Sequence, residues 1–427
     1  MKSFSGFSRS ENQVIVIGGG PTGMMAALTA AETGAAVTLW ERNDCLGKKL
    51  SITGKGRCNI TNNASTEELI ENMPGNGIFL YGAFNRFPAQ STMDFFEKLG
   101  VELKTERGRR VFPLSDSANQ VVGALRHRLE EAGINIHYQR RAARLLSKEG
   151  RISGVEDTRQ ESQAAVAVIL ATGGASYPAT GSSGDGYKIA LAVGHSLIKP
   201  RPALAPLEIT ENWPKELSGL SLKNVGLSAY FAGKALRREF GELLFTHFGL
   251  SGPIVLSLSR SITALPNGGA GAQLILDLKP ALSFEQVDKR LQRDIEAASR
   301  KYIINALAGL TPAALLAPLL RLAEIPHNKY AHQLSRAERI KLAALLKALP
   351  ITVKGPRPLA EAIVTAGGVH VKEIDPQTMA SKKRSGLFIA GELLDVDGYT
   401  GGYNLQAAWS SGYIAGQAAA RYCSEYS

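Results

Sequence analysis

The chain has 427 residues, of which 44% are hydrophobic and 20% are charged. These values are typical of a globular protein, and the length is sufficient for two or three domains. The formal net charge of +11 suits a protein that holds a polyphosphate group. The charge also permits contact with nucleic acid or an anionic membrane, and a basic solvated surface explains it as well.

The cysteines and the N-terminal segment argue against several classes of protein. Cys45, Cys58 and Cys423 form no CxxC pair and no Cys/His cluster with zinc spacing, so we predict no metal site and a reducing compartment. Residues 1–13 are polar and lack the apolar centre of a signal peptide. No run reaches the roughly 20 apolar residues of a membrane-spanning helix, so we expect a soluble, cytoplasmic protein.

The first predicted elements are a strand, a glycine turn, a helix and a second strand. The apolar run at 14–17 leads into GGGPTG at 18–23, which has the pattern G-x-G-x-x-G. An alanine-rich helical pattern at 24–33 and a second apolar run at 36–40 follow, and that run ends at Glu41. This order predicts a dinucleotide-binding unit rather than an isolated glycine-rich turn.

The residues of this turn have distinct expected roles. Gly18 allows the tight turn, Gly20 lets backbone N–H groups approach a pyrophosphate, and Gly23 lets the helix and strand pack closely. Glu41 lies about 20 residues further on, where a carboxylate accepts hydrogen bonds from ribose hydroxyls. The predicted cofactor contacts of this unit are Gly18, Gly20, Thr22, Gly23, Glu41 and Arg42.

A polar, glycine-rich and basic loop at 47–62 comes next. Within ten positions it holds four cations, namely Lys48, Lys49, Lys55 and Arg57. The loop either lines the cofactor from the pyrophosphate onward or is a solvated basic loop. Cys58 stands alone, whereas disulfide-reductase flavoproteins use two nearby cysteines, so we predict no redox role for it. The candidate cofactor or substrate contacts here are Lys49, Arg57 and Asn59.

The middle of the chain first continues the α/β pattern and then changes character. Helical and strand patterns lead to an apolar strand at 165–170, and the composition shifts at residue 199. Capping boxes that begin at Ser283 and Ser335 indicate helices in the region that follows. We predict a cofactor-binding domain over 12–198 and 384–427, a β-rich substrate domain over 199–280 and 350–383, and a helical insert over 281–349.

Three later segments indicate which dinucleotide is bound. The strand at 165–170 is followed by Ala-Thr-Gly-Gly at 171–174, the strand at 385–390 ends in Gly-Glu at 391–392, and Gly-Gly at 401–402 precedes a small-residue helix. These segments resemble the motifs of two-dinucleotide-binding-type flavoproteins, which implies FAD rather than NAD. The middle of the chain has no second G-x-G-x-x-G motif, so NAD(P)H is expected only as a transient electron donor.

The likeness to known flavoproteins extends over nearly the whole chain. The segments GKKLSITGKGRCNITN at 47–62, LFTHFGLSGP at 244–253 and AGGV at 366–369 resemble the BaiN/HI0933-like flavoprotein family. Its members are FAD-containing oxidoreductases, with proposed activities that include reduction of unsaturated bile-acid intermediates and oxidation of aminoacetone. We therefore expect an α/β fold, in which a Rossmann-like FAD-binding domain from both chain ends carries an inserted mostly-β domain with a helical subdomain.

The resemblance also implies contacts along the cofactor. The Ala-Thr-Gly turn closes over FAD, the Gly-Glu pair contacts the ribityl chain, and a hairpin at Ala142 crosses the adenine. The helix that opens at Asn404 either directs its N–H groups toward the flavin N1 and C2 carbonyl or is buried for packing only. The further predicted cofactor contacts are Ala142, Ala171, Thr172, Gly173, Gly391, Glu392, Gly402, Asn404 and Leu405.

The catalytic residues are less constrained by the sequence. His247 lies in the glycine-rich turn at 244–253, where it is either a proton donor or base or a structural residue, and Arg57 is the second candidate. We expect hydride transfer between flavin N5 and a small organic substrate, with reduction of a C=C bond by NAD(P)H as one form. The alternatives are a peroxide-producing oxidase of a small amine or ketone, and a basic FAD-containing RNA-binding protein. We find no nucleic-acid recognition module, and no pattern indicates the oligomeric state.

Overall fold

The computed structural model describes residues 13–426, so the polar segment at 1–12 lies outside the described part of the chain. The chain divides into two compact units. Unit 1 comprises Met1–Arg201 and Ile363–Ser427, and unit 2 comprises Pro202–Ala362. Both chain ends therefore contribute to one unit, and the expected fold class is confirmed.

The boundary on the C-terminal side differs from the expected one. Residues 363–383, which we assigned to the β-rich domain, belong to unit 1. The reason is strand pairing, because β18 (Val364–Val369) pairs with β11 (Leu197–Ala203). Ile374 and Met379 are fully buried in the unit 1 core, so the segment after β18 packs there as well.

Unit 1 is organised around a parallel sheet with the strand order β19-β10-β1-β2-β6. Strands that are buried on both faces have nearly continuous apolar sequences, which is why the apolar segments of this chain form the centre of the parallel sheet. Four residues of β1 and all four of β10 are buried. The strands are β1 (Gln13–Ile17), β2 (Ala36–Trp40), β6 (Asn135–His137), β10 (Ala167–Leu170) and β19 (Leu387–Ile389).

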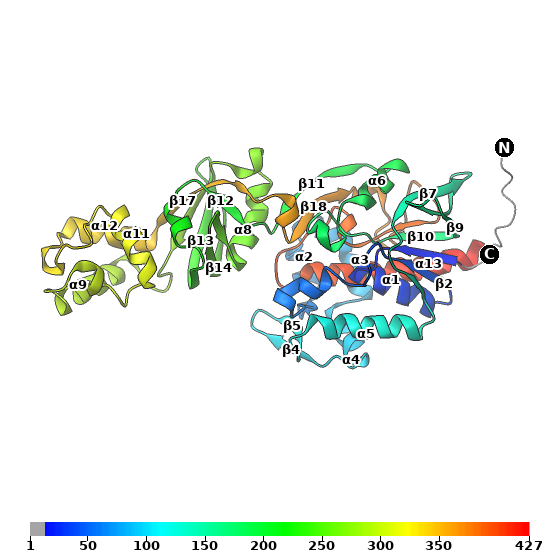
Figure 1. The fold of residues 1–427 in the computed structure, drawn as a ribbon, viewed down its shortest axis with the longest axis horizontal. Helices are drawn as coiled ribbons and strands as arrows, with labels where there is room; N and C mark the ends of the chain where they lie inside the picture. Colours follow the sequence, from blue (N-terminus) through cyan, green and yellow to red (C-terminus); the bar gives the residue numbers. More distant parts are fainter. Residues whose placement is uncertain (1–12, 427) are drawn as a thin grey trace. The chain divides into compact units, whose positions relative to one another are not determined.

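Helices from opposite ends of the chain pack together beside this sheet. In Figure 1, α1 (Pro21–Glu32) is blue and α13 (Tyr403–Tyr426) is red. Their close approach requires glycine, because a Cβ at Gly412 would lie 2.4 Å from the Thr22 carbonyl oxygen, and one at Gly416 would lie 2.4 Å from that of Ala26. The helix predicted at 24–33 begins three residues earlier, at Pro21, because proline is well suited to a first helical turn.

Smaller elements surround the sheet in unit 1. One three-stranded sheet consists of β3 (Thr61–Asn62), β4 (Leu103–Glu106) and β5 (Arg110–Pro113), and another of β7 (Ala142–Lys148), β8 (Arg151–Asp157) and β9 (Ser162–Ala164). The remaining α-helices are α2 (Thr66–Glu71), α3 (Tyr81–Arg86), α4 (Ala89–Lys98), α5 (Ala118–Glu131) and α6 (Asp185–Ala192).

Unit 2 contains a closed antiparallel barrel with the strand order β12-β15-β14-β13-β16-β17. The mostly-β prediction is thus correct, although closure of the barrel could not be read from the sequence. The strands are β12 (Leu207–Ile209), β13 (Ser221–Phe231), β14 (Lys234–Thr246), β15 (Gly249–Ser251), β16 (Gln273–Asp277) and β17 (Leu349–Pro356).

Helices complete unit 2 and share its apolar core. The capping boxes at Ser283 and Ser335 are confirmed, since each serine hydroxyl accepts from the backbone N–H three residues on. The helices are α7 (Trp213–Glu216), α8 (Pro253–Thr263), α9 (Phe284–Ala297), α10 (Ile303–Ala306), α11 (Ala313–Leu322) and α12 (Arg336–Lys347). Within residues 13–426, no helix combines the length and apolarity needed to cross a membrane.

Candidate functional site

The glycine turn after β1 has the geometry of a tight strand-to-helix connection. Gly18 has a φ of +109°, and its N–H donates to the Trp40 carbonyl oxygen at 2.8 Å. A Cβ at Gly23 would lie 1.8 Å from the Gly18 carbonyl oxygen, so only glycine fits there. A Cβ at Gly20 would meet nothing within 4 Å. The turn is therefore packed on one side and open at Gly20, where α1 begins.

Glu41 lies against this turn, as its position after β2 predicted. Its carboxylate accepts from the Gly19 N–H at 2.7 Å, and from the backbone and side-chain N–H groups of Asn43, each at 2.7 Å. Only 6% of Glu41 is exposed. The hydrogen bonds fix both oxygens: Oε1 accepts from both Asn43 donors, whereas Oε2 accepts only from Gly19 and keeps capacity for a further donor such as a ribose hydroxyl.

Lys49 and Glu392 are 343 residues apart in the sequence and meet in the fold. Lys49 Nζ lies 3.0 Å from Glu392 Oε2 and 2.8 Å from Ser176 Oγ. The Thr365 N–H donates to Glu392 Oε1 at 2.9 Å, and the Thr365 hydroxyl accepts from the Ala175 N–H at 2.9 Å. The sequence predicted Lys49 and Glu392 but missed Ser176 and Thr365, which lie just outside the segments singled out at 171–174 and 366–369.

Gly391 completes the contact between the late strand and the first helix. Its φ is +73°, and a Cβ there would lie 2.2 Å from Thr22 Oγ1. Its N–H donates to Ser411 Oγ at 3.1 Å. Thr22 is itself 6% exposed, so this predicted contact lies at the α1–Gly391 junction. No pattern in the sequence pointed to Ser411, whose hydroxyl also donates to the Ala407 carbonyl one turn earlier in α13.

Arg42 and Ala142 lie near the start of α6. Arg42 pairs with Asp185 at 3.0 Å, and Arg141 pairs with the same carboxylate at 2.7 Å. Burial opposes ionisation of Asp185, but hydrogen bonds from Arg141 and Ser183 bring its pKa below the usual range. Ala142 is buried at the first position of β7. The Gly-Asp-Gly segment at 184–186 thus anchors two arginines, a role the sequence did not indicate.

Two of the four buried polar side-chain atoms that lack a partner among the described residues belong to predicted cofactor contacts. Asn59 Oδ1 and Thr172 Oγ1 are buried and find no hydrogen-bond partner among the described residues. An unsatisfied buried polar group costs about 1–3 kcal/mol, so a ligand that supplies the partner is favoured there. Both atoms belong to predicted cofactor contacts. Together with the open N-terminus of α1 at Gly20, they suit a polar dinucleotide.

The segment before α13 has a packing role beyond the predicted one. Gly402 has a φ of +102°, and a Cβ there would lie 2.4 Å from the Thr61 carbonyl oxygen. Asn404 Oδ1 accepts from the Gly398 N–H at 2.8 Å, and its Nδ2 donates to the Gly398 and Tyr399 carbonyls. Leu405 is half-buried in the first turn. These side chains shape the loop, and the backbone N–H groups of the first turn remain the available donors.

The two catalytic candidates lie in different units. Arg57 in unit 1 pairs with Glu106 and Asp116 and stacks over the Phe112 ring at 4.1 Å, and the hydrogen bonds to Glu106 and Asp116 raise its pKa. These carboxylates already compensate its charge. His247 in unit 2 is exposed between β14 and β15, where its ring contacts Phe248 edge-on with centroids 4.9 Å apart.

Cys58 and the remaining predicted turn residues are also placed. Burial raises the pKa of the Cys58 thiol to about 12, which agrees with the absence of a predicted redox role. Ala171 is buried beside Gly18, and Gly173 has a φ of +71°. Within the described residues, no group of three or more His, Cys, Asp or Glu side chains could hold a metal ion.

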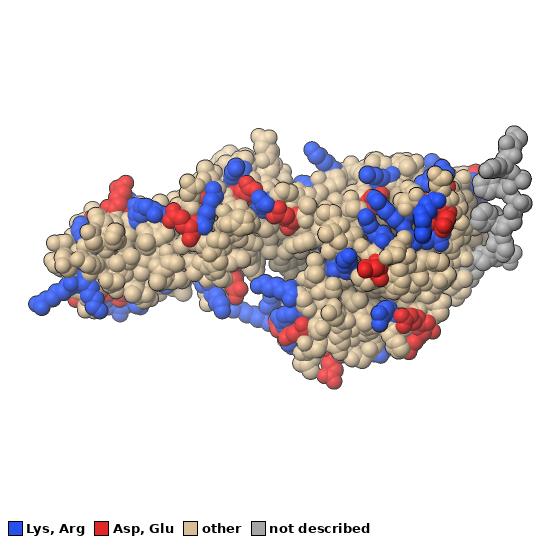
Figure 2. Space-filling view, in the orientation of Figure 1, with Lys and Arg blue, Asp and Glu red and all other residues tan. Residues whose placement is uncertain are grey.

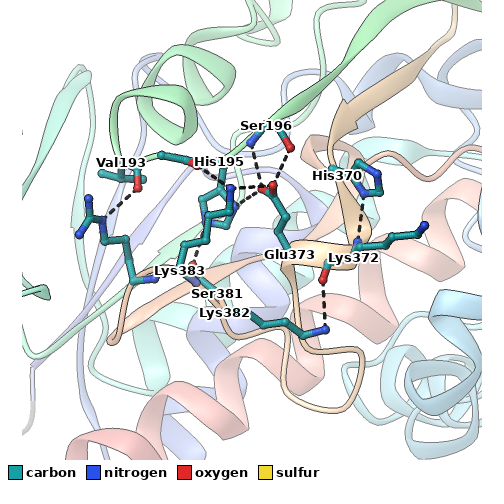
Figure 3. A network of polar contacts seen from close by, with 11 residues as sticks. Val193, His195, Ser196, His370, Lys372, Glu373, Ser381, Lys382 and Lys383 are labelled. Carbon is teal, nitrogen blue, oxygen red and sulfur yellow. Dashed lines mark hydrogen bonds and ion pairs between the residues drawn. The ribbon is translucent and has the colours of Figure 1, made fainter.

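A second polar cluster lies around His195, as Figure 3 shows. Its ring is hydrogen-bonded to Glu373 through Nδ1 at 3.0 Å and to Ser381 Oγ through Nε2 at 2.8 Å. Ser381 Oγ also accepts from the Lys383 and Arg384 N–H groups. Because this hydroxyl is held by two backbone donors inside a loop, the cluster fastens the loop before β19 to the residues after α6. The sequence did not bring these residues together.

Comparison with known proteins relates these features to a family. Residues 12–418 match the family model described as HI0933-like protein Rossmann domain. The chain is 33% identical over 412 residues to a 3-dehydro-bile acid delta(4,6)-reductase of Clostridium scindens, covering 96% of this chain and 99% of the relative. It is 30% identical over 403 residues to a ribosomal RNA dihydrouridine synthase of Escherichia coli, covering 94% and 96%.

Solved structures agree on the fold. A 3-ketosteroid delta1-dehydrogenase from Sterolibacterium denitrificans superposes with a TM-score of 0.54 at 15% identity, covering 97% of this chain and 100% of that one. A 3-ketosteroid-delta4-(5alpha)-dehydrogenase from Rhodococcus jostii gives a TM-score of 0.51 at 15% identity, covering 98% and 99%. On the strength of the family match and the relatives of full length, the chain belongs to the HI0933-like Rossmann family and is an FAD-dependent oxidoreductase.

Proposed function

We propose that this protein transfers a hydride between flavin N5 and a carbon–carbon double bond conjugated to a carbonyl group. The observation that carries the proposal is chemical. One relative is named for reducing delta(4,6) bonds of a 3-dehydro bile acid, and another for forming dihydrouridine. Both names describe saturation of a C=C bond in conjugation with a carbonyl, although the substrates differ. The shared reaction is therefore a better guide than either substrate.

The residues of unit 1 have defined tasks in this proposal. The N–H groups at the start of α1 bind the pyrophosphate, and Glu41 accepts from the ribose hydroxyls. Lys49 and Glu392 hold the polar middle of the cofactor, and the first turn of α13 supplies donors where negative charge collects on reduction. FAD supplies the hydride acceptor and donor when bound. The chain's own contribution is to orient the cofactor and to stabilise that charge.

Proton transfer and electron supply complete the reaction. Reduction of a conjugated C=C bond adds a hydride at one carbon and a proton at the other, and His247 is our candidate proton donor. NAD(P)H is our candidate electron donor, bound transiently at the same flavin. The three cysteines form no disulfide, which agrees with the reducing cytoplasm that we propose as the location.

An anaerobic two-step experiment tests the proposed function. The purified holoprotein is titrated with NADH or NADPH until the flavin bleaches, and a 3-oxo-4,6-diene bile acid is then added without air. We expect the oxidised flavin spectrum to return as the substrate is saturated, with mass spectrometry showing a gain of two hydrogens. Reoxidation only after admission of air, with release of peroxide, would instead establish the oxidase alternative.

Uridine in RNA is the second candidate substrate. Two relatives are named as ribosomal RNA dihydrouridine synthases, and the chain carries a net charge of +11. The same reduced holoprotein is incubated with ribosomal RNA, and nucleosides are analysed for dihydrouridine. Its appearance selects this substrate. RNA that binds with no dihydrouridine formed would support the non-catalytic RNA-binding alternative.

A further inference from the structure

Strands β4 and β5 of unit 1 join in a basic turn, Arg107-Gly108-Arg109-Arg110. Gly108 and Arg109 have φ values of +77° and +58°, which close a short turn between the strands. A left-handed backbone is uncommon for a residue other than glycine, so Arg109 is held there by its surroundings. All four residues are exposed. In Figure 2, Lys and Arg side chains gather where Figure 1 draws β5.

One buried amide joins this turn to the start of α13. Asn62 is 2% exposed, and its Nδ2 donates to the Gly108 carbonyl at 3.0 Å and to the Gly401 carbonyl at 2.9 Å. The neighbouring Asn63 N–H donates to the Arg109 carbonyl at 2.8 Å. The turn is thus fixed relative to Gly401, which lies two residues before Tyr403, the first residue of the helix whose first turn we assign to the flavin. It is a preorganised feature rather than a solvated loop.

The acidic groups nearby do not neutralise the turn. Arg109 pairs with Glu68, and Arg110 lies 3.8 Å from Glu106. Glu106 also pairs with Arg57, and Arg57 forms a second ion pair with Asp116.

Arg107 has no carboxylate partner among the described residues and is fully available to a ligand.

We propose that the Arg107–Arg110 turn binds an oxyanion, a carboxylate or a phosphate, that the substrate carries at a distance from its reducible bond. Guanidinium groups bind planar oxyanions through paired N–H donors, and an excess of positive charge concentrates anions within about 10 Å at 0.1 M salt. The identity of the reducible bond rests on the proposed function. The anion site depends only on the turn and its link to Gly401.

The first experiment measures how the positive charge of the turn affects reoxidation of the flavin, and it assumes nothing about the substrate. Holoenzyme is reduced with dithionite and mixed in a stopped-flow instrument with ferricyanide, an anionic oxidant, or with hexaammineruthenium(III), a cationic one. The variant is Arg107→Gln/Arg109→Gln. The control is Arg126→Gln on α5, because the Arg126 side chain is 59% exposed and paired with Glu130, much as Arg109 is 58% exposed and paired with Glu68.

We expect the double variant to be reoxidised by ferricyanide about fivefold more slowly, with a weaker salt dependence, while the ruthenium rate is unchanged or higher. FAD content and melting temperature should match those of the control variant. If the double variant and Arg126→Gln show the same rates with both oxidants, the turn is not electrostatically coupled to the flavin and the proposal is wrong.

The second experiment identifies the source of the anion. Binding of a 3-oxo-4,6-diene bile acid, of its methyl ester and of a short oligouridylate is followed through the flavin absorbance. We expect the double variant to bind the free acid about tenfold more weakly and the ester as before. A loss confined to oligouridylate would assign the oxyanion to phosphate. Unchanged binding of all three would overturn the proposal, whereas failure of the proposed function would appear as binding without hydride transfer.

Discussion

The two units bury different kinds of side chains. Unit 1 encloses carboxylate, amide and imidazole groups such as Glu41, Asn62 and His195. The polar side chains buried in unit 2 are three hydroxyls among the described residues, Ser257, Ser259 and Thr263, all on α8. Burying a charged or amide group is costly unless it is paired, so its presence needs a reason beyond stability. We therefore expect the polar groups that bind the cofactor in the core of unit 1, and we look for any function of unit 2 among its exposed side chains.

The largest effect should come from filling the tight contact inside the glycine turn. In Gly23→Ala the new Cβ would lie 1.8 Å from the Gly18 carbonyl oxygen, so the turn must open and FAD should be lost almost entirely. FAD content of the purified variant measures this directly. The matched control is Gly123→Ala on α5, where a Cβ meets nothing within 4 Å and the helix should gain about 0.5–1 kcal/mol. A yellow, FAD-loaded Gly23→Ala protein would contradict the comparison.

The surface of unit 2 is tested at His247. If this exposed side chain serves proton transfer, His247→Gln should keep FAD content and the flavin spectrum but lose about a hundredfold in turnover. If it is a structural turn residue, melting temperature should fall while turnover per loaded molecule is retained. Both quantities are measured on one preparation. Full turnover at full FAD occupancy removes His247 from the mechanism.

Glu41 tests whether a buried carboxylate of unit 1 serves the cofactor. In Glu41→Ala the ribose hydroxyls lose a charged acceptor, and the Gly19 N–H loses its partner as well. Hydrogen bonds to charged groups are worth about 1.5–3 kcal/mol, so FAD affinity should fall roughly ten- to a hundredfold. Titration of apoprotein with FAD measures the change. Glu41→Gln keeps one oxygen acceptor but removes the charge. Partial recovery of FAD affinity in this variant would separate the effect of hydrogen bonding from that of charge.

The smallest expected effect is on the pH dependence of unit 1 stability. Burial lowers the pKa of His195, and hydrogen bonds from Lys383, Ser196 and His195 outweigh burial and lower that of Glu373 to about 2. Both groups bind protons more weakly in the folded state than in the unfolded state. The stability that His195 contributes is therefore lost as the pH falls below about 6.5, and that of Glu373 as the pH falls below about 4.5. Melting temperature should therefore decline with acidification.

His195→Asn supplies the control for this pH dependence. It removes the imidazole, so the part of the decline that begins near pH 6.5 should become shallower while the part below pH 4.5 remains. Melting curves between pH 8 and about pH 2 in buffers of equal ionic strength distinguish the two parts. Parallel curves for the variant and the unchanged protein would show that His195 does not contribute.

Much of unit 1 follows from the sequence because its signals are local. The apolar runs that become β1, β2 and β10 bring the motif at their carboxyl ends to one edge of the parallel sheet. Gly23 is required by a contact with Gly18 only five residues away, and Gly18 by its own positive φ, so the pattern of the turn is visible along the chain. Glu41 is placed by the same logic, since it directly follows the second strand.

The tertiary structure decided what depends on distant pairs. Lys49 meets Glu392 across 343 residues, Asn62 joins the Arg107–Arg110 turn to Gly401, and His195 meets Glu373 and Ser381. The barrel of unit 2 likewise closes through the pairing of β12 with β17, whose partners are separated by the whole helical region. Spacing along the chain carries no signal for such contacts, because loop closure over long distances costs little extra free energy and leaves no local pattern. The sequence by itself determined the cofactor turn and the class of fold, while the polar pairs that shape the site were decided by folding.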